Sequence, residues 1–330
     1  METIKKPQAI LVYNDKDITL DISKYLISLS YSDYEKDQSD ELSITLNDKE
    51  NLFKTAWKPQ KGDKIAAKIG YLGEELLNCG SFTVDENEIS LSDGGNIVTI
   101  RALAASINDK IREKNSKAYE NKLLVDIAKE IGKKHNFKVV GSEGFIKIQR
   151  ATQYNESDLS FLRRISAEYG YIFKLCDNLL VFTKIDTLEK TEPLTTLTLK
   201  DISTVSLRDT STKTYTSCRV QYFNAKTGKY QSVTVKGDRQ DVKKEVLKLN
   251  VKCQSKEEAI TKAKAGLKTG QNTIEGSLTL KSGNRYFIAG ANFTMTDGLG
   301  FYGGKFHIKS STHEITHDNY TCSGEVYKIA

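Results

Sequence analysis

Alternating hydrophobic and polar residues run through the first third of the chain and predict a series of short β-strands. The alternation covers residues 9–13, 18–21, 27–34, 41–47, 64–71, 79–88 and 96–105. Strands of this length, separated by turn signals such as Asn14-Asp15 and Asp93-Gly94-Gly95, are typical of a barrel or a sandwich. We therefore expect residues 1–105 to form a first β-barrel domain.

The hydrophobic spacing changes over residues 106–190, which predict a small α/β insert domain. A helix is expected within residues 116–135, because Leu124, Ile127 and Ile131 recur at helical spacing and share one face. Residues 137–140 then predict a strand.

A second helix is expected between residues 153 and 170. Asn155 or Ser157 can cap its N-terminus, and Gly170 supplies the left-handed residue that commonly ends a helix. Residues Leu159, Leu162, Ile165 and Tyr169 give it an apolar face. Two strands, residues 171–175 and 179–183, are predicted to follow around a turn at Asp177-Asn178.

Residues 191–330 return to β-strand patterns and are expected to form a second β-barrel. Candidate strands cover residues 194–199, 218–223, 230–236, 247–251, 277–281, 291–296, 305–316 and 320–328. One Ala-rich helix interrupts them over residues 255–268, with Ser255 and Glu258 in the positions of a capping box. The predicted fold class is therefore α+β, mainly β.

Charge is unevenly distributed along the chain. Residues 1–105 hold 12 Lys+Arg and 18 Asp+Glu, residues 106–190 hold 16 and 12, and residues 191–330 hold 21 and 13. This asymmetry suggests polar subunit contacts or opposite faces of an assembly. Specific nucleic-acid binding is not expected, because the lysines are scattered and no aromatic-basic recognition motif accompanies them.

Cysteine usage and hydropathy bear on where the protein is made. The 5 cysteines are widely spaced and lack a C-x-x-C pair, which is typical of free thiols in a reducing compartment. The apolar run at residues 9–13 is too short for a signal peptide, and no run approaches the ~18 residues of a membrane helix. We expect synthesis in a cytoplasm and no membrane binding by the chain itself.

No catalytic, cofactor or metal site is predicted. His313 and His317 lie about 13 Å apart on an extended strand, too far for two ligands of one metal. The glycine-rich stretch at residues 298–304 is interpreted as the connection of a hairpin. The neighbouring carboxylates Glu74-Glu75 and Glu86/Glu88 are interpreted as acidic residues on the surface of a β-sheet. Trp57 is expected to plug the end of a barrel, and Arg163, Arg164 and Glu168 to form a solvated helix face.

The segment YNESDLSFLRRISAEYGYIF, residues 154–173, resembles the hallmark of the phage late control protein D family. These are baseplate hub proteins of contractile tails, related to the N-terminal part of type VI secretion spike proteins. Residues 255–267 and 303–316 are also similar to the family, and residues 1–105 more loosely so. The matching hallmark residues are Glu156, Ser157, Asp158, Phe161, Leu162, Arg164, Ile165, Gly170 and His313.

The resemblance implies a structural role and no enzyme activity. Two tail-tube-like barrels per chain, assembled as a homotrimer, would form a pseudo-sixfold ring that adapts a hexameric tail tube to a trimeric spike. Implied partners are the tail tube protein, a separate spike polypeptide, the tape-measure protein and other baseplate proteins, within the tail baseplate. The sheet faces that line the lumen are expected to be polar.

Two alternatives remain open from the sequence. One is a cell-wall-binding or wall-degrading tail component. The other is the same hub in a contractile bacteriocin or an extracellular injection system.

Overall fold

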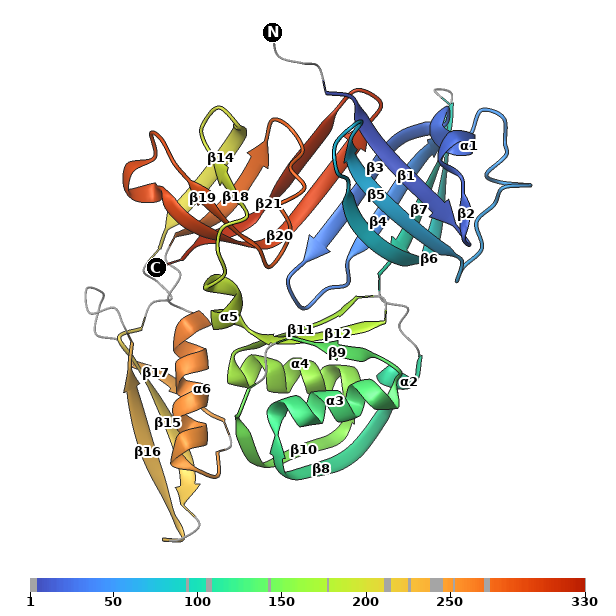
Figure 1. The fold of residues 1–330 in the computed structure, drawn as a ribbon. Helices are drawn as coiled ribbons and strands as arrows, with labels where there is room; N and C mark the ends of the chain where they lie inside the picture. The colour runs from blue at the N-terminus through green and yellow to red at the C-terminus, as the bar shows by residue number, and fades with distance from the viewer. Residues whose placement is uncertain are drawn as a thin grey trace.

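The computed structural model places two β lobes side by side above an α/β insert, with a smaller satellite unit next to the insert (Figure 1). The residues that the structure describes are 5–92, 95–104, 109–141, 144–176, 178–210, 215–224, 227–237, 246–251, 253–269 and 274–329.

The first lobe contains the strands of the N-terminal third. Its elements are β1 (Pro7–Tyr13), β2 (Lys16–Asp17), α1 (Thr19–Ser23), β3 (Leu26–Tyr34), β4 (Glu41–Asn47), β5 (Lys64–Tyr71), β6 (Leu77–Ser92) and β7 (Gly95–Leu103).

The second lobe comes from two separated stretches of the C-terminal half. Its elements are β13 (Thr195–Leu197), β14 (Ile202–Asp209), β18 (Ile274–Leu280), β19 (Asn292–Met295), the 3-10 helix η1 (Gly300–Tyr302), β20 (Gly304–Thr316) and β21 (Tyr320–Lys328).

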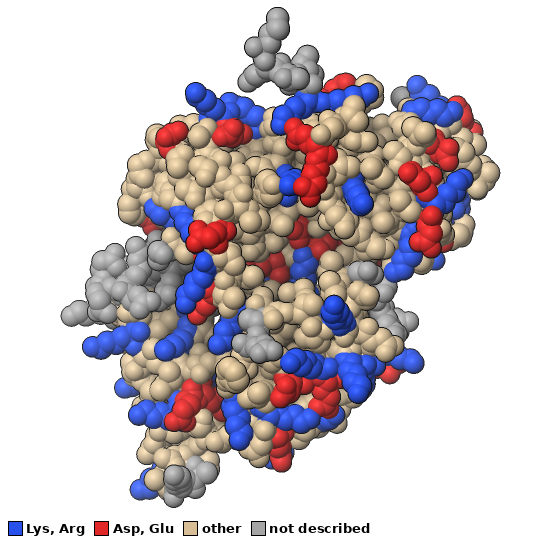
Figure 2. Space-filling model, viewed as in Figure 1, with Lys and Arg blue, Asp and Glu red and all other residues tan. Residues whose placement is uncertain are grey.

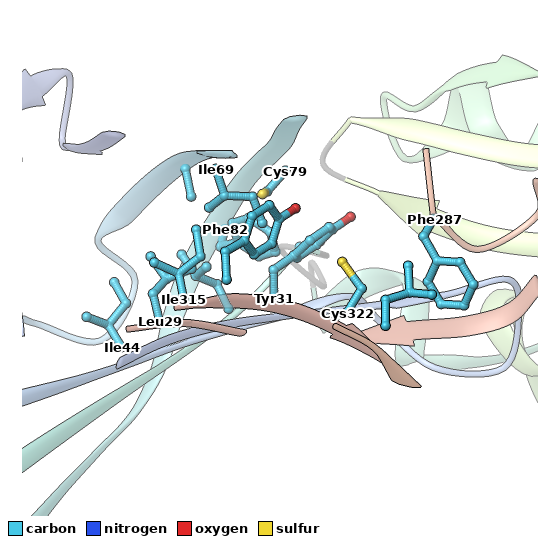
Figure 3. Close-up of a cluster of buried hydrophobic side chains, with 14 of the residues drawn as sticks. Leu29, Tyr31, Ile44, Ile69, Cys79, Phe82, Phe287, Ile315 and Cys322 are labelled. Atoms are coloured by element: carbon cyan, nitrogen blue, oxygen red, sulfur yellow. The ribbon is translucent and has the colours of Figure 1, made fainter. Parts of the chain in front are cut away.

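The two lobes share one 13-stranded sheet and one hydrophobic core. The strand order is β14-β18-β21-β20-β3-β4-β7-β6-β5-β1-β2, with β19 pairing to β20 and β13 outside this path. Figure 3 shows Leu29, Tyr31 and Phe82 of the first lobe on the same side of the sheet as Ile315 and Cys322 of the second. Each lobe therefore buries its apolar residues against the other as well as within itself.

The insert lies beneath the lobes and has a separate core. Its elements are α2 (Asp109–Arg112), β8 (Lys114–Leu123), α3 (Leu124–Lys134), β9 (Lys138–Val140), β10 (Lys147–Ser157), α4 (Asp158–Tyr169), β11 (Tyr171–Cys176), β12 (Leu179–Lys184) and α5 (Ile185–Glu189). Helices α3 and α4 bury their apolar faces between the two-stranded sheet β10-β8 and the three-stranded sheet β11-β12-β9.

The satellite unit contains β15 (Ser217–Asn224), β16 (Lys229–Lys236), β17 (Val246–Leu249) and α6 (Lys256–Thr269). Helix α6 packs on one face of the sheet β16-β15-β17 and encloses a third core, which includes Val220, Ala259 and Ala263. The sequence placed these residues within a second barrel; in the structure, helix α6 packs beside α4 of the insert. The division into domains at residues 105 and 190 stays a prediction.

The expectation of a mainly β fold is confirmed, and most strands lie where the alternation placed them. Strands β4, β5 and β21 have the predicted limits. Residues 18–21 were expected to be a strand but largely form α1, and β8, β10 and β14 were not expected. The predicted turn residues Asp93, Gly94 and Asp177 lie outside the described residues.

A shared core predicts that the two lobes unfold together. Leu29 of the first lobe and Ile308 of the second are both fully buried in it. Replacing either by Ala should destabilise the same calorimetric transition by about 2–5 kcal/mol, because each change leaves a cavity. Lys68→Ala, at an exposed position of β5, is the control. Two lobe transitions that respond separately to the two variants would contradict this prediction.

Candidate functional site

The hallmark segment straddles the junction of β10 and α4. Gln153 to Ser157 end the strand, and the helix begins at Asp158. The Ser157 hydroxyl caps the helix by accepting a hydrogen bond of 3.1 Å from the Ser160 amide. Ser157, one of the two candidates, is therefore the cap, while Asn155 sits in the strand with a positive φ of 47°.

Asp158 lies at the centre of a hydrogen-bond network within the insert. Its buried carboxylate accepts hydrogen bonds from Asn115 (3.1 Å), Lys134 (2.7 Å) and Gln153 (2.8 Å), and lies 2.7 Å from His135 Nε2. Burial alone would raise the pKa of Asp158, but these hydrogen bonds outweigh it and hold the pKa well below its usual range. An ionised Asp158 thus ties together β8, the end of α3, β10 and α4.

Arg164 connects the start of the hallmark to its end. Its guanidinium makes a bidentate contact with Glu156 (3.2 and 2.9 Å) and donates to Glu168 (3.2 Å) one helical turn on. Glu168 in turn accepts from Lys262 of α6 at 2.9 Å. The sequence interpretation of Arg164 and Glu168 as a simple solvated face is therefore incomplete, since both belong to a network that reaches the satellite.

Lys262 carries this network into the interface between α4 and α6. The side chain is buried and lies 3.1 Å from Glu258, whose carboxylate also accepts from Tyr169 at 2.7 Å. Burial would lower the pKa of Lys262, but Glu168 and Glu258 outweigh it and the pKa lies above its ordinary value. Lys262 is therefore a charged bridge between insert and satellite.

The apolar hallmark residues serve the core of the insert. Phe161, Leu162 and Ile165 are at most 1% exposed and pack between α3 and the strands. Gly170 ends α4 with a φ of 72°, and a Cβ atom there would lie 3.3 Å from Ala265 Cβ of α6. Glycine at this position thus permits both the left-handed cap and the close approach of α6.

A buried ion cluster joins the insert to the first lobe. Lys174 of β11 reaches Asp33 of β3 at 2.7 Å and Asp40, just before β4, at 2.8 Å. Burial raises the pKa of Asp40 to about 6, against the opposing effect of the Lys174 ammonium. The sequence alone did not reveal this cluster, because its members are far apart in the chain and each is an ordinary charged residue.

His313 lies far from the other hallmark residues, in the core shared by the lobes. Its Nε2 donates to the Phe287 carbonyl (3.0 Å), and its Nδ1 accepts from the Tyr320 hydroxyl (2.8 Å). Burial lowers the pKa of His313 to about 4, so the ring is neutral at pH 7. His317 is exposed beyond the end of β20, and the described residues contain no cluster of His, Cys, Asp and Glu that could hold a metal.

A polar face runs across both lobes, on the side of the sheet opposite the core. We call it the hydroxyl face, because short Ser and Thr side chains dominate it from β14 to β7. None of its members is buried, and the strand registers place them in adjoining rows. They are Ser28, Ser30, Ser32, Ser43, Thr45, Thr99, Thr204, Ser206, Ser277, Thr279, Ser310, Thr312, Thr316, Thr321 and Ser323.

The alternation Ser28-x-Ser30-x-Ser32 was visible in the sequence, and it was the available signal for this face. The sequence could not show that the pattern continues in register from β3 into β20, where Thr312 pairs with Ser32 and Thr316 with Ser28. That continuity depends on a strand pairing between residues nearly 300 positions apart.

A cleft of about 600 Å³ separates the second lobe from the insert. Opposite charges line it, including Arg163, which donates to the Asp37 carbonyl at 3.0 Å, and Lys309, which bonds Glu275 at 2.9 Å.

The described part of the chain has no helix that is both long and apolar enough to span a membrane.

Solved structures with the same architecture include tail proteins and a component of a type VI secretion system. The 43 kDa tail protein of prophage MuSo2 from Shewanella oneidensis has a TM-score of 0.72 at 13% identity, covering 97% of this chain and 98% of that one. A tail protein from Neisseria meningitidis MC58 has a TM-score of 0.72 at 9% identity, covering 98% and 97%. An Escherichia coli component of the type VI secretion system has a TM-score of 0.54 at 12% identity, covering 93% and 74%. The fold is therefore that of tail proteins.

Residues 93–319 match the model of the phage tail baseplate hub (GPD) family, and the chain belongs to that family. The probable baseplate hub protein of Escherichia phage 186 is 28% identical over 238 residues, 70% of this chain and 60% of the relative. That of Escherichia phage P2 is 31% identical over 166 residues, 50% and 42%. The alignments thus cover less than two thirds of these relatives.

Removing the Asp158 carboxylate should strongly destabilise the insert. Asp158→Ala removes the acceptor of four side chains, of which His135 and Gln153 are buried, and we expect a loss of about 3–5 kcal/mol in the free energy of unfolding. Asp126→Ala, an exposed acidic residue in the first turn of α3, is the matched control. Chemical denaturation that gives equal losses for both variants would show that the hydrogen bonds to Asp158 do not stabilise the insert.

His313 should make the shared core sensitive to acid. Its pKa is about 4 when folded and near 6.5 when unfolded, so between these values the unfolded chain binds more protons. The contribution of His313 to the free energy of unfolding is fully present above pH 6.5. It falls by about 3 kcal/mol as the pH drops to 4.

His313→Gln isolates that contribution, because the Gln amide can donate to Phe287 and accept from Tyr320 without titrating. Asp40 acts in the opposite direction over part of the same range, since its folded pKa is raised to about 6. The relevant measurement is therefore the difference in unfolding free energy between wild type and variant from pH 7 to pH 4. A difference that does not change with pH would contradict the neutral assignment of His313.

Proposed function

We propose that this chain is a structural hub of a contractile tail that adapts a hexameric tail tube to a trimeric spike. The observation that carries the proposal is the hydroxyl face, a continuous polar surface across two lobes that share one sheet. Three copies, each with two lobes, would offer six lobes to the tube and a true threefold surface to the spike. The family membership and the tail-protein fold support this assignment.

In this proposal the hydroxyl face lines the lumen of the ring. Ser and Thr side chains stay hydrated, expose little apolar area and carry no fixed charge. The charged residues among them, Glu41, Arg101, Glu314 and Glu325, are of both signs, so passing cargo finds neither an apolar patch nor a dense surface of one charge. The insert and the satellite then lie outside the lumen, toward the spike or the outer layer. The hallmark residues fix the shape of the insert and take no part in chemistry.

The proposed partners are further copies of this chain, the tube protein, the spike protein, the tape-measure protein and other baseplate proteins. The role is structural, in the tail baseplate, and does not include catalysis. Light scattering of the purified chain mixed with its tube and spike proteins measures the stoichiometry. A particle with three copies is expected, and a single copy in the presence of both partners would overturn the proposal.

An aromatic residue on the hydroxyl face should impair the tail without unfolding the chain. Ser277 is exposed in β18, so Ser277→Trp should leave the melting temperature nearly unchanged. We expect assembled tails whose infection or killing titre falls by about tenfold or more, because a bulky apolar group obstructs the lumen. Ser23→Trp, at an exposed position of α1, is the control. An unchanged titre for Ser277→Trp would show that this face does not line the lumen.

A further inference from the structure

We infer that the open face of the satellite sheet is a docking site for an acidic extended protein segment with an apolar anchor. The sheet β16-β15-β17 has α6 on one face only, and the alternation of exposure along its strands leaves the other face open. In Figure 1 this unit lies at the periphery of the molecule, with α6 between the sheet and α4. The inference rests on this surface and does not depend on the proposed hub role.

The charges that the described residues place on the open face are of one sign. Arg219 of β15, Lys236 of β16 and Lys248 of β17 are exposed, and none of them forms an ion pair with any residue that the structure describes. The three strands contain no Asp or Glu. Figure 2 shows basic side chains along the lower left margin, where Figure 1 places this unit.

Two of these cations are direct neighbours across the sheet. Arg219 and Lys248 are Cα partners in the parallel pair of β15 and β17, so both side chains project from the same face. Like charges in this position repel and destabilise a sheet. Lysines on an edge strand can be explained by protection against unwanted strand pairing, but that explanation does not apply to Arg219, because β15 is the central strand. An anionic partner would remove the repulsion.

The far end of the same face presents two aromatic rings. Phe223 of β15 is paired in register with Tyr230 of β16, and the ring centroids are 5.4 Å apart in an edge-to-face arrangement. The exposed fractions are 39% for Phe223 and 77% for Tyr230. Phe223 lies four positions after Arg219 along the strand, which corresponds to about 13 Å. An extended segment could therefore place carboxylates at one end of the face and an apolar side chain at the other.

The arrangement favours a polypeptide over a nucleic acid. A single-stranded nucleic acid needs cations along its whole backbone and free ring faces for stacking. Here the cations gather at one end, the middle of the face carries the neutral residues Gln221 and Ser232, and the two rings already contact each other.

Fluorescence polarisation with defined probes tests the inference. The probe is a fluorescein-labelled peptide of four glutamates, a glycine and two leucines, and its comparator has lysines in place of the glutamates. We expect the glutamate peptide to bind at least about tenfold more tightly than the lysine peptide at low salt, and more weakly as salt screens the charges. Equal affinities for the two peptides would overturn the inference.

Variants locate the binding site on the satellite. Arg219→Glu combined with Lys248→Glu should weaken binding of the glutamate peptide by about tenfold or more, and Tyr230→Ala should weaken it to a smaller extent. Lys129→Glu combined with Lys133→Glu, two exposed lysines on α3, is the matched control and should leave the affinity within about twofold. If the double reversal does not fold, Arg219→Gln with Lys248→Gln replaces it. Equal losses in control and test variants would overturn the inference.

Two further outcomes would assign the surface to a different occupant. A ten-nucleotide oligothymidylate that binds more tightly than the glutamate peptide, and loses affinity in the same variants, would identify a nucleic-acid site. Self-association of the chain in light scattering that the Arg219 and Lys248 variants abolish would identify a second copy as the partner. Either result would overturn the inference of an acidic protein segment.

Discussion

The antiparallel pairing of β3 with β20 is the interaction on which the rest of the molecule depends. It runs from the pair Ser310–Tyr34 to the pair Thr316–Ser28 and makes one sheet of two lobes whose strands come from opposite ends of the chain. Because side chains alternate strictly across a sheet, this register decides which residues of both lobes face the core. A slip of one residue would turn His313 and Ile315 toward solvent and bring Thr312 and Glu314 into the core.

The insert is joined to this sheet by a buried ion cluster as well as by the packing of Cys176 against the shared core. Its core is separate from that of the lobes, and Lys174 between Asp33 and Asp40 lies where β11 meets the first lobe. Buried ion clusters of this kind add little net stability, but they are costly to break and so define one arrangement of the parts they join. Lys262 has the same role between the insert and the satellite, where Glu168 and Glu258 bind it.

The sequence predicted those elements whose stability is local. Helix α4 was predicted with its cap and its end because Ser157 and Gly170 act within one turn of the helix, and β4 because apolar and polar residues alternate without interruption. Strands β8 and β10 were missed because Lys, Glu and Asn on their exposed face interrupt the apolar pattern, so that only tertiary pairing shows them to be strands. The short α1 was taken for a strand because Ile18, Leu20 and Ile22 alternate, although only Ile22 is buried.

For the hallmark, the sequence indicated which residues matter but not what they bind. Asp158 was one of the residues that match the family hallmark, yet its partners Asn115, Lys134 and His135 come from elements that the chain brings together only on folding. The same holds for Arg164, which would be an ordinary surface residue without Glu156 on one side and the Glu168–Lys262 pair on the other. The charges of the hallmark therefore make specific polar contacts that join the elements of the insert to one another and, through Glu168 and Lys262, to the satellite.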